Sequence, residues 1–174
     1  MSRLQTGALT ILARPIGLDE IVPATLAGLA YQDRHVEVKV PETLPRVNAD
    51  PALLERAIAN VVANALAWSP ADRPVRVQAR ERGGRVELRI IDQGPGIPAD
   101  ARDRIFQPFQ RLGDSGGGGV GLGLAVAHGF LTAMGGEITP HDTPGGGLTM
   151  LLSLPVAEPA PAQHAADGDP GGRR

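Results

Sequence analysis

The chain has 174 residues, a formal net charge of −2 and 42% apolar residues. This length indicates a single domain, the apolar content excludes a wholly disordered chain, and the near-neutral charge argues against a nucleic-acid partner. The chain contains no cysteine, which excludes disulfides and cysteine-based zinc or thiol chemistry. No apolar run approaches the ~18 residues of a membrane helix, so we expect this chain to be soluble and cytoplasmic.

The first half of the chain predicts a strand, a helix, a second strand and a long helix. Residues 9–18 are typical of an extended segment, and Asp19 is a candidate N-cap for a helix that runs to about residue 30. Residues 35–40 alternate polar and apolar side chains, as a half-buried strand does. Asp50 and Pro51 form a favourable start for the long helix, whose apolar residues recur with helical periodicity.

The second half begins with a hairpin and continues with helices. Two apolar segments, residues 75–79 and 86–91, flank a turn at residues 82–85 that carries two glycines, which is a good hairpin pattern. A short helix is expected at residues 99–104 and a longer one at residues 121–134.

The remaining segments complete the expected fold. Residues 113–119 include five glycines and predict a mobile loop, residues 137–139 and 148–154 predict the last strands, and a disordered tail is expected over residues 156–174. This order of elements does not alternate as a doubly wound sheet would. It predicts an α/β fold, a two-layer sandwich with a mixed sheet packed under three helices.

Two asparagines stand on one face of the predicted long helix. Asn60 and Asn64 are four residues apart, about one turn, and lie close to the apolar stripe. Helix interiors disfavour asparagine. Carboxamide oxygens suit Mg²⁺, which also takes phosphate oxygens, but such a pair can equally cap nearby loops, and the helix alone leaves both interpretations open.

Asp92 ends a predicted strand and is followed by Gly94 and Gly96. A carboxylate there can accept a hydrogen bond from the exocyclic amino group of adenine, while the glycines let the backbone approach the ring. Taken alone, the segment is as readily a Gly-Pro-Gly turn with an incidental aspartate.

Glycines at positions 119, 121 and 123 precede an apolar helix, where free backbone amides and the helix dipole favour phosphate. The segment lacks the βαβ context of a Rossmann fingerprint. No P-loop pattern is present, and the single lysine, Lys39, is far from any glycine run.

Together with residues 105–109, these segments occur in a fixed order: residues 60–65, 92–97, 105–109 and 119–124. In this order they resemble the N, G1, F and G2 boxes of the ATP-binding domain shared by sensor histidine kinases, gyrase, Hsp90 and MutL. The resemblance covers residues 9–155 and implies a Bergerat-type ATP-binding fold.

Further segments narrow the resemblance to KdpD-type sensor kinases, which respond to potassium limitation: residues 1–5, 121–124, 134–136 and 142–150. Residues 1–8 look like the end of a dimerisation helix that leads into the catalytic domain. Potassium or osmotic signalling is the implied role.

The resemblance assigns roles to individual residues. Asn64 matches the Mg²⁺ ligand, Asn60 a residue that contacts phosphate or the metal shell, and Asp92 the adenine reader, while Arg111 would lie near the phosphates. The other implied nucleotide-binding residues are Trp68, Gly94, Gly96, Ile97, Phe106, Gly119, Gly121, Leu122, Gly123, Leu124 and Thr149. Among these, Phe106 pairs with Phe109 to anchor the lid, and Thr149 helps to hold Asp92 through its hydroxyl.

Three positions bear on activity. The family usually places lysine and tyrosine where this chain has Ala67 and Trp68, so we expect nucleotide binding to be weaker by about 1–2 kcal/mol. Hydrolysing relatives carry a glutamate at the position of Asn60, which cannot act as a base. We therefore expect phosphoryl transfer from ATP with Mg²⁺ and little hydrolysis.

None of the four histidines has the sequence surroundings of the family's phosphoacceptor histidine. The resemblance therefore implies an acceptor histidine on a separate dimerisation domain. It also implies a longer protein that lies in the plasma membrane. A response regulator of the KdpE type would act downstream, and the isolated domain should be a monomer. Two other readings are an anti-sigma-type Ser/Thr kinase and a degenerate module that only binds nucleotide.

Overall fold

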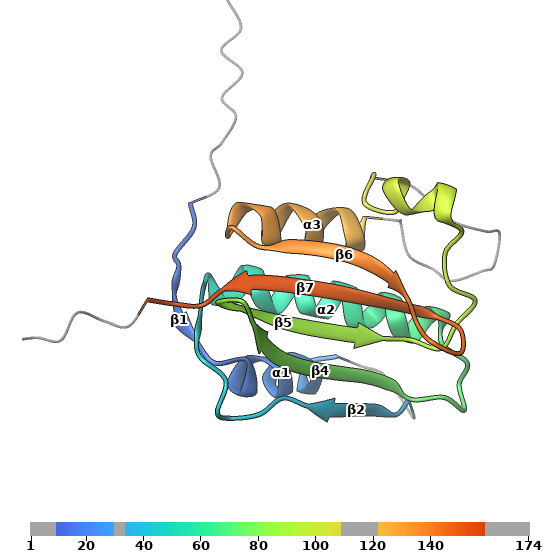
Figure 1. Cartoon of the computed structure of the whole chain (residues 1–174), viewed down its shortest axis with the longest axis horizontal. Coiled ribbons are helices and arrows are strands. Elements are labelled where there is room, and N and C mark those ends of the chain that lie inside the picture. The colour runs from blue at the N-terminus through green and yellow to red at the C-terminus, as the bar shows by residue number, and fades with distance from the viewer. Residues whose placement is uncertain (1–9, 30–33, 109–121, 159–174) are drawn as a thin grey trace, which may run out of the picture.

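Figure 1 presents the computed structural model of the chain, which describes residues 10–29, 34–108 and 122–158. Several expectations therefore lie outside the described residues. They concern the linker at residues 1–8, the glycine-rich loop at residues 113–119 and the tail beyond residue 158.

A five-stranded mixed sheet forms one layer of the domain (Figure 1). Its first two strands are parallel, and each later pair is antiparallel. The strands lie in the order β2 (Val36–Lys39), β4 (Val75–Arg82), β5 (Arg85–Ile91), β7 (Leu148–Pro155) and β6 (Glu137–Asp142). The expected hairpin is confirmed as β4 and β5, and Gly83 and Gly84 both take positive φ angles in its turn, as a type I′ turn requires.

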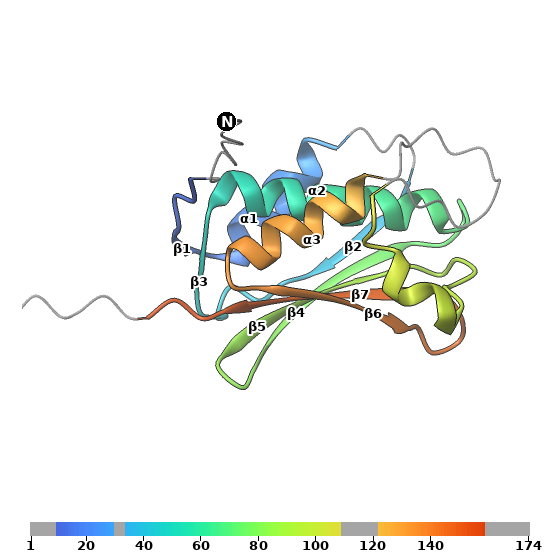
Figure 2. The same cartoon turned by 90° about the horizontal axis from the view of Figure 1, so that it is seen from above.

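Three helices cover one face of this sheet, as Figure 2 shows. They are α1 (Leu18–Ala27), α2 (Pro51–Trp68) and α3 (Gly123–Ala133). A short 3-10 helix, η1 (Ala99–Arg104), is tied to the end of β6 by an ion pair between Arg102 and Asp142. The predicted two-layer α/β sandwich is confirmed. No helix within the described residues is long and apolar enough to cross a membrane.

The core lies between the two layers, and α2 is its centre. This helix buries one stripe of side chains against the sheet and the neighbouring helices, and the stripe consists of Leu54, Ala57, Ile58, Val61, Val62, Ala65 and Leu66. On the sheet side, the core consists of alternate residues of β4, β5 and β7, because successive side chains of a strand point to opposite faces of the sheet. Val77, Leu88, Ile90 and Leu152 are all buried in this way.

The structure differs from the sequence-based expectations in two places. Asp19 is not the cap of α1, because the helix begins at Leu18 with Gly17 in the N-cap position and Asp19 lies in the first turn. The sequence did not predict β3 (Val47–Ala49), which pairs with β1 (Arg14–Ile16) in a separate two-stranded sheet. Just after β7, Val156 bridges to Val47 and donates its backbone N–H to the carbonyl oxygen of Gly84.

Asp50 caps α2 and also fastens the N-terminal segment. One carboxylate oxygen accepts the backbone N–H groups of Ala52 and Leu53, and the other accepts that of Leu12 at 2.8 Å. These bonds, that from Leu12 first, hold the pKa of the Asp50 carboxyl below its usual value. A carboxyl with a lowered native pKa stabilises the fold above its unfolded-state pKa and loses that effect as the pH falls through the native pKa.

Replacing Asp50 with alanine should lower the melting temperature by several degrees at neutral pH, because the cap and the bond to Leu12 are both lost. Asp50→Asn is the matched control, since asparagine caps nearly as well. Thermal unfolding from pH 7 down to pH 3 should show the alanine deficit shrinking toward low pH. A deficit that stays constant with pH would contradict the role of the charged carboxylate.

Candidate functional site

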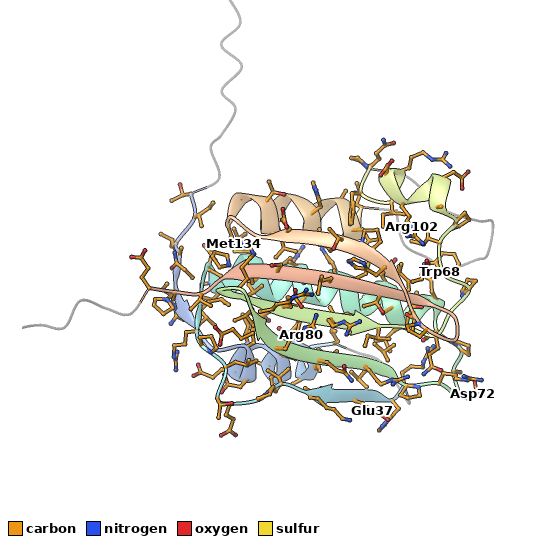
Figure 3. All side chains as sticks on the ribbon, in the orientation of Figure 1. Glu37, Trp68, Asp72, Arg80, Arg102 and Met134 are labelled. Carbon is orange, nitrogen blue, oxygen red and sulfur yellow. The ribbon has the colours of Figure 1, made fainter. Side chains whose placement is uncertain are left out.

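The candidate site lies at the end of the sandwich where α2 and β5 finish and β7 begins. Trp68, Asp72 and Arg102, labelled in Figure 3, all lie at this end of the molecule. Asn60 and Asn64 are half-buried on α2, and within the described residues their side-chain amides make no hydrogen bond. A Cβ placed on Gly123 would lie 3.8 Å from the Cβ of Asn60, so α3 begins directly beside this asparagine.

Asp92 follows β5 and is the principal acid of the site. Its residue is only 2% exposed, and its Oδ1 accepts the backbone N–H groups of Gly94 and Leu148, both at 2.9 Å. Oδ2 has no hydrogen-bond partner among the described residues. Burial raises the pKa of the Asp92 carboxyl, and the two backbone bonds offset part of that rise. The carboxylate is thus held through one oxygen, and its other oxygen makes no hydrogen bond to the described residues.

Three glycines allow the chain to pack closely around Asp92. A Cβ on Gly94 would come within 2.5 Å of the carbonyl oxygen of Trp68. Gly96 has a φ of 74°, and Gly147, with a φ of 111°, packs so closely that a Cβ would overlap the carbonyl oxygen of Asp92. L-residues rarely adopt such positive φ angles. Glycine is therefore required at Gly94 for space and at Gly147 for both reasons.

Thr149 acts on Asp92 less directly than the resemblance implied. Its buried hydroxyl lies 3.0 Å from that of Thr143, and the Thr143 hydroxyl donates to the backbone carbonyl of Asp92 at 3.3 Å. Thr149 therefore supports the main chain through Thr143, and no bond joins it to the carboxylate. Sequence reasoning missed Thr143, although it stands just before the final glycine run.

The other implied residues divide into described and undescribed ones. Phe106 stacks on the ring of His128 with ring centroids 5.0 Å apart, so it contacts α3. Leu122 is the N-cap residue of α3, Gly123 and Leu124 form its first turn, and Ile97 packs against the core. Arg111, Phe109, Gly119 and Gly121 lie outside the described residues.

The donor set of the site fits a hard cation that is bound mainly through phosphate. Within the described part of the chain, no three His, Cys, Asp or Glu side chains form a metal-binding group. Asn60 and Asn64 offer amide oxygens, the type of ligand that Mg²⁺ accepts alongside water and phosphate oxygens. The start of α3 beside Asn60 presents helix N-terminal amides, which favour anions.

The fold and this site define a class of ATPase domain. The sequence profile described as "Histidine kinase-, DNA gyrase B-, and HSP90-like ATPase" matches residues 49–158, and the chain belongs to this family. Within the family it is of the sensor histidine kinase type. It is 45% identical to "Sensor protein KdpD" of Rathayibacter rathayi and 42% identical to the protein of that name in Mycobacterium tuberculosis, over 100% and 92% of this chain.

The chain spans about a fifth of the length of these relatives, 20% and 19% respectively. Solved structures support the same class. The "Mycobacterial sensor histidine kinase MprB" matches with a TM-score of 0.72 and 31% identity over 83% of this chain and 98% of that one. Full-length ShkA in complex with AMPPNP matches with a TM-score of 0.75 and 28% identity over 88% of this chain and 33% of that one.

Proposed function

We propose that residues 9–155 of this chain form the ATP-binding catalytic domain of a KdpD-type sensor histidine kinase. It would transfer the γ-phosphoryl group of ATP to a histidine on a separate dimerisation domain. The observation that carries the proposal is the buried Asp92, which is anchored through Oδ1 while Oδ2 remains without a partner among the described residues. A carboxylate oxygen held in this way can accept the amino group of adenine.

The remaining residues of the site would hold the phosphates. We assign Asn64 to a Mg²⁺ ion and Asn60 to phosphate, since both residues are half-buried and their side-chain amides make no hydrogen bond to the described residues. Mg²⁺, when bound, would neutralise phosphate charge during transfer. The first turn of α3, at Leu122, Gly123 and Leu124, would donate backbone amides to the same phosphates.

The chemistry best suited to this site is transfer rather than hydrolysis. The residue one turn before Asn64 is Asn60, whose amide cannot remove a proton from water. Each of the three described histidines contacts a neighbouring side chain: His128 stacks on Phe106, His141 lies 2.9 Å from the hydroxyl of Thr139, and His35 lies 4.0 Å from the carboxylate of Glu37. These contacts support an acceptor histidine on another domain.

The relatives also support a proposal about the cellular role of the longer protein. From the similarity to proteins named KdpD, we propose that the chain belongs to a membrane-anchored sensor for potassium or osmotic stress, with this domain on the cytoplasmic side. Its product phosphohistidine would serve a response regulator of the KdpE type. We expect the isolated domain to be a monomer.

Calorimetric titration with ATP, with and without Mg²⁺, tests the proposal. ATP should bind, and Mg²⁺ should increase the affinity. Asn64→Ala should reduce the increase in affinity that Mg²⁺ produces by about tenfold. Asn48→Ala is the matched control, because Asn48 is an exposed asparagine on β3 away from the site.

Mixing the domain with a KdpD-type dimerisation hairpin and labelled ATP then tests the transfer step, since only a catalytically competent domain should label the histidine. Binding without labelling would favour the non-catalytic reading, for which Ala67 in the usual lysine position is the supporting feature. An absence of ATP binding at millimolar concentration would refute the proposal.

A further inference from the structure

Resting on the function proposed above, we infer that Ser69 and Arg73 are positioning residues for adenine recognition. Neither residue lies among those implied to contact nucleotide. Both instead hold Gln93, the residue between Asp92 and Gly94. Through Gln93 they would fix the direction in which the free carboxylate oxygen of Asp92 points.

The main chain of Gln93 is held by Ser69. The backbone N–H of Gln93 donates to the Ser69 hydroxyl at 3.1 Å, and Ser69 is buried, with 5% exposure, where α2 ends. Ser69 is itself fixed, because Arg34 donates to its carbonyl oxygen at 2.7 Å. The bond between Gln93 and Ser69 therefore connects the end of α2, the helix that carries Asn64, to the segment that carries Asp92.

The side chain of Gln93 is held by Arg73. The guanidinium of Arg73 donates to Oε1 of Gln93 at 2.9 Å. Arg73 is placed for this by a turn in which its backbone N–H donates to the carbonyl of Pro70 at 3.1 Å. Gln93 is thus bonded through both its main chain and its side chain to the segment of residues 69–73.

These contacts govern Asp92 through the next peptide. The N–H of Gly94 is one of two donors that orient Oδ1 of Asp92, and the position of that N–H follows from the position of Gln93. Gly94 also lies against the carbonyl of Trp68, where a Cβ would approach within 2.5 Å. If the bond from Gln93 to Ser69 is lost, the peptide before Gly94 can shift away from α2, and Oδ2 then turns away from the amino group of the base.

The test compares the affinity of the domain for Mg-ATP, Mg-GTP and Mg-tripolyphosphate by calorimetry. Ser69→Ala should weaken ATP binding about five- to tenfold, the range expected for the loss of one partly buried hydrogen bond. It should lower the ATP-to-GTP preference by a similar factor and leave tripolyphosphate unchanged, because the phosphate-binding groups are untouched. Ser69→Thr, which keeps the hydroxyl, should restore ATP affinity.

Two further variants complete the design. Arg73→Ala removes an exposed hydrogen bond without disturbing the core, and we expect a two- to threefold loss of affinity for ATP. Ser153→Ala is the matched control. It also removes a serine hydroxyl that accepts a hydrogen bond, from Arg85 of β5, but Ser153 lies on β7 away from the site. An unchanged ATP-to-GTP preference in Ser69→Ala, or equal losses for ATP and tripolyphosphate, would overturn the inference while leaving the proposed function intact. A wild-type domain that fails to bind ATP would overturn both.

Discussion

Asp92→Asn should reduce ATP affinity by about 100-fold or more while raising the melting temperature of the ligand-free domain. The asparagine oxygen can still accept from Gly94 and Leu148, but the amide nitrogen would stand where Oδ2 stands. A donor then faces the donor of the adenine amino group, so a favourable charged bond becomes an unpaired contact.

The gain in stability follows from the pKa. Burial raises the pKa of the Asp92 carboxyl, so the native state holds the proton more tightly than the unfolded chain does. Wild-type stability should therefore fall as the pH rises from the unfolded-state pKa through the native pKa, and the neutral asparagine does not share this loss. Asp92→Asn should match the wild type at low pH and exceed it above the native pKa.

Thermal unfolding of both proteins between pH 3 and pH 8, together with ATP titration, would measure the two effects. Asp100→Asn, in the exposed part of η1, serves as the control and should alter neither. An Asp92→Asn domain that melts lower than the wild type at neutral pH would show that the carboxylate stabilises the fold and would contradict this account.

Gly147→Ala should destabilise the domain by about 2–4 kcal/mol. The new methyl group would overlap the carbonyl oxygen of Asp92, and the backbone there has a φ of 111°. The clash can be relieved only by moving Asp92 or the start of β7, so we expect ATP binding to be lost as well.

Gly145→Ala provides a matched control for this substitution. Gly145 also has a positive φ, 89°, but among the described residues no atom other than those of its chain neighbours lies within 4 Å of the position that an alanine Cβ would take. Its alanine variant should show only the backbone strain, about 1 kcal/mol, and should bind ATP normally. Chemical denaturation of the two variants separates strain from overlap, and equal losses would show that Gly147 makes no essential contact with Asp92.

Local patterns predicted most of the helices and strands. Asp50 and Pro51 marked the start of α2, and alternation marked β2, because capping and burial act over a few neighbouring residues. The pairing of β1 with β3 was not predicted, since three-residue strands carry too little pattern. Asp19 was misread as a cap because acidic residues suit both the N-cap and the first turn, and only the backbone conformation of Gly17 decides between them.

The site was predicted in its parts but not in its connections. Spacing identified Asn60, Asn64 and Asp92, and their roles toward a nucleotide stay predictions. Thr143, Ser69 and Arg73 were missed because each acts through a contact distant in sequence. Ser69 lies 24 positions from its partner Gln93, and Leu148 lies 56 from Asp92. Only a three-dimensional fold reveals such pairs.

The segment around Asp92, which follows β5, is bonded to two other elements. Gln93 bonds to Ser69 at the end of α2, and Asp92 bonds to Leu148 at the start of β7, the strand that pairs with both β5 and β6. A ligand that binds Asp92 would therefore stabilise the closure of the C-terminal hairpin onto the rest of the sheet, by linkage. The occupancy of the site and the cohesion of β6 and β7 with the domain become one equilibrium, and a fragment that ends before β7 would lack both.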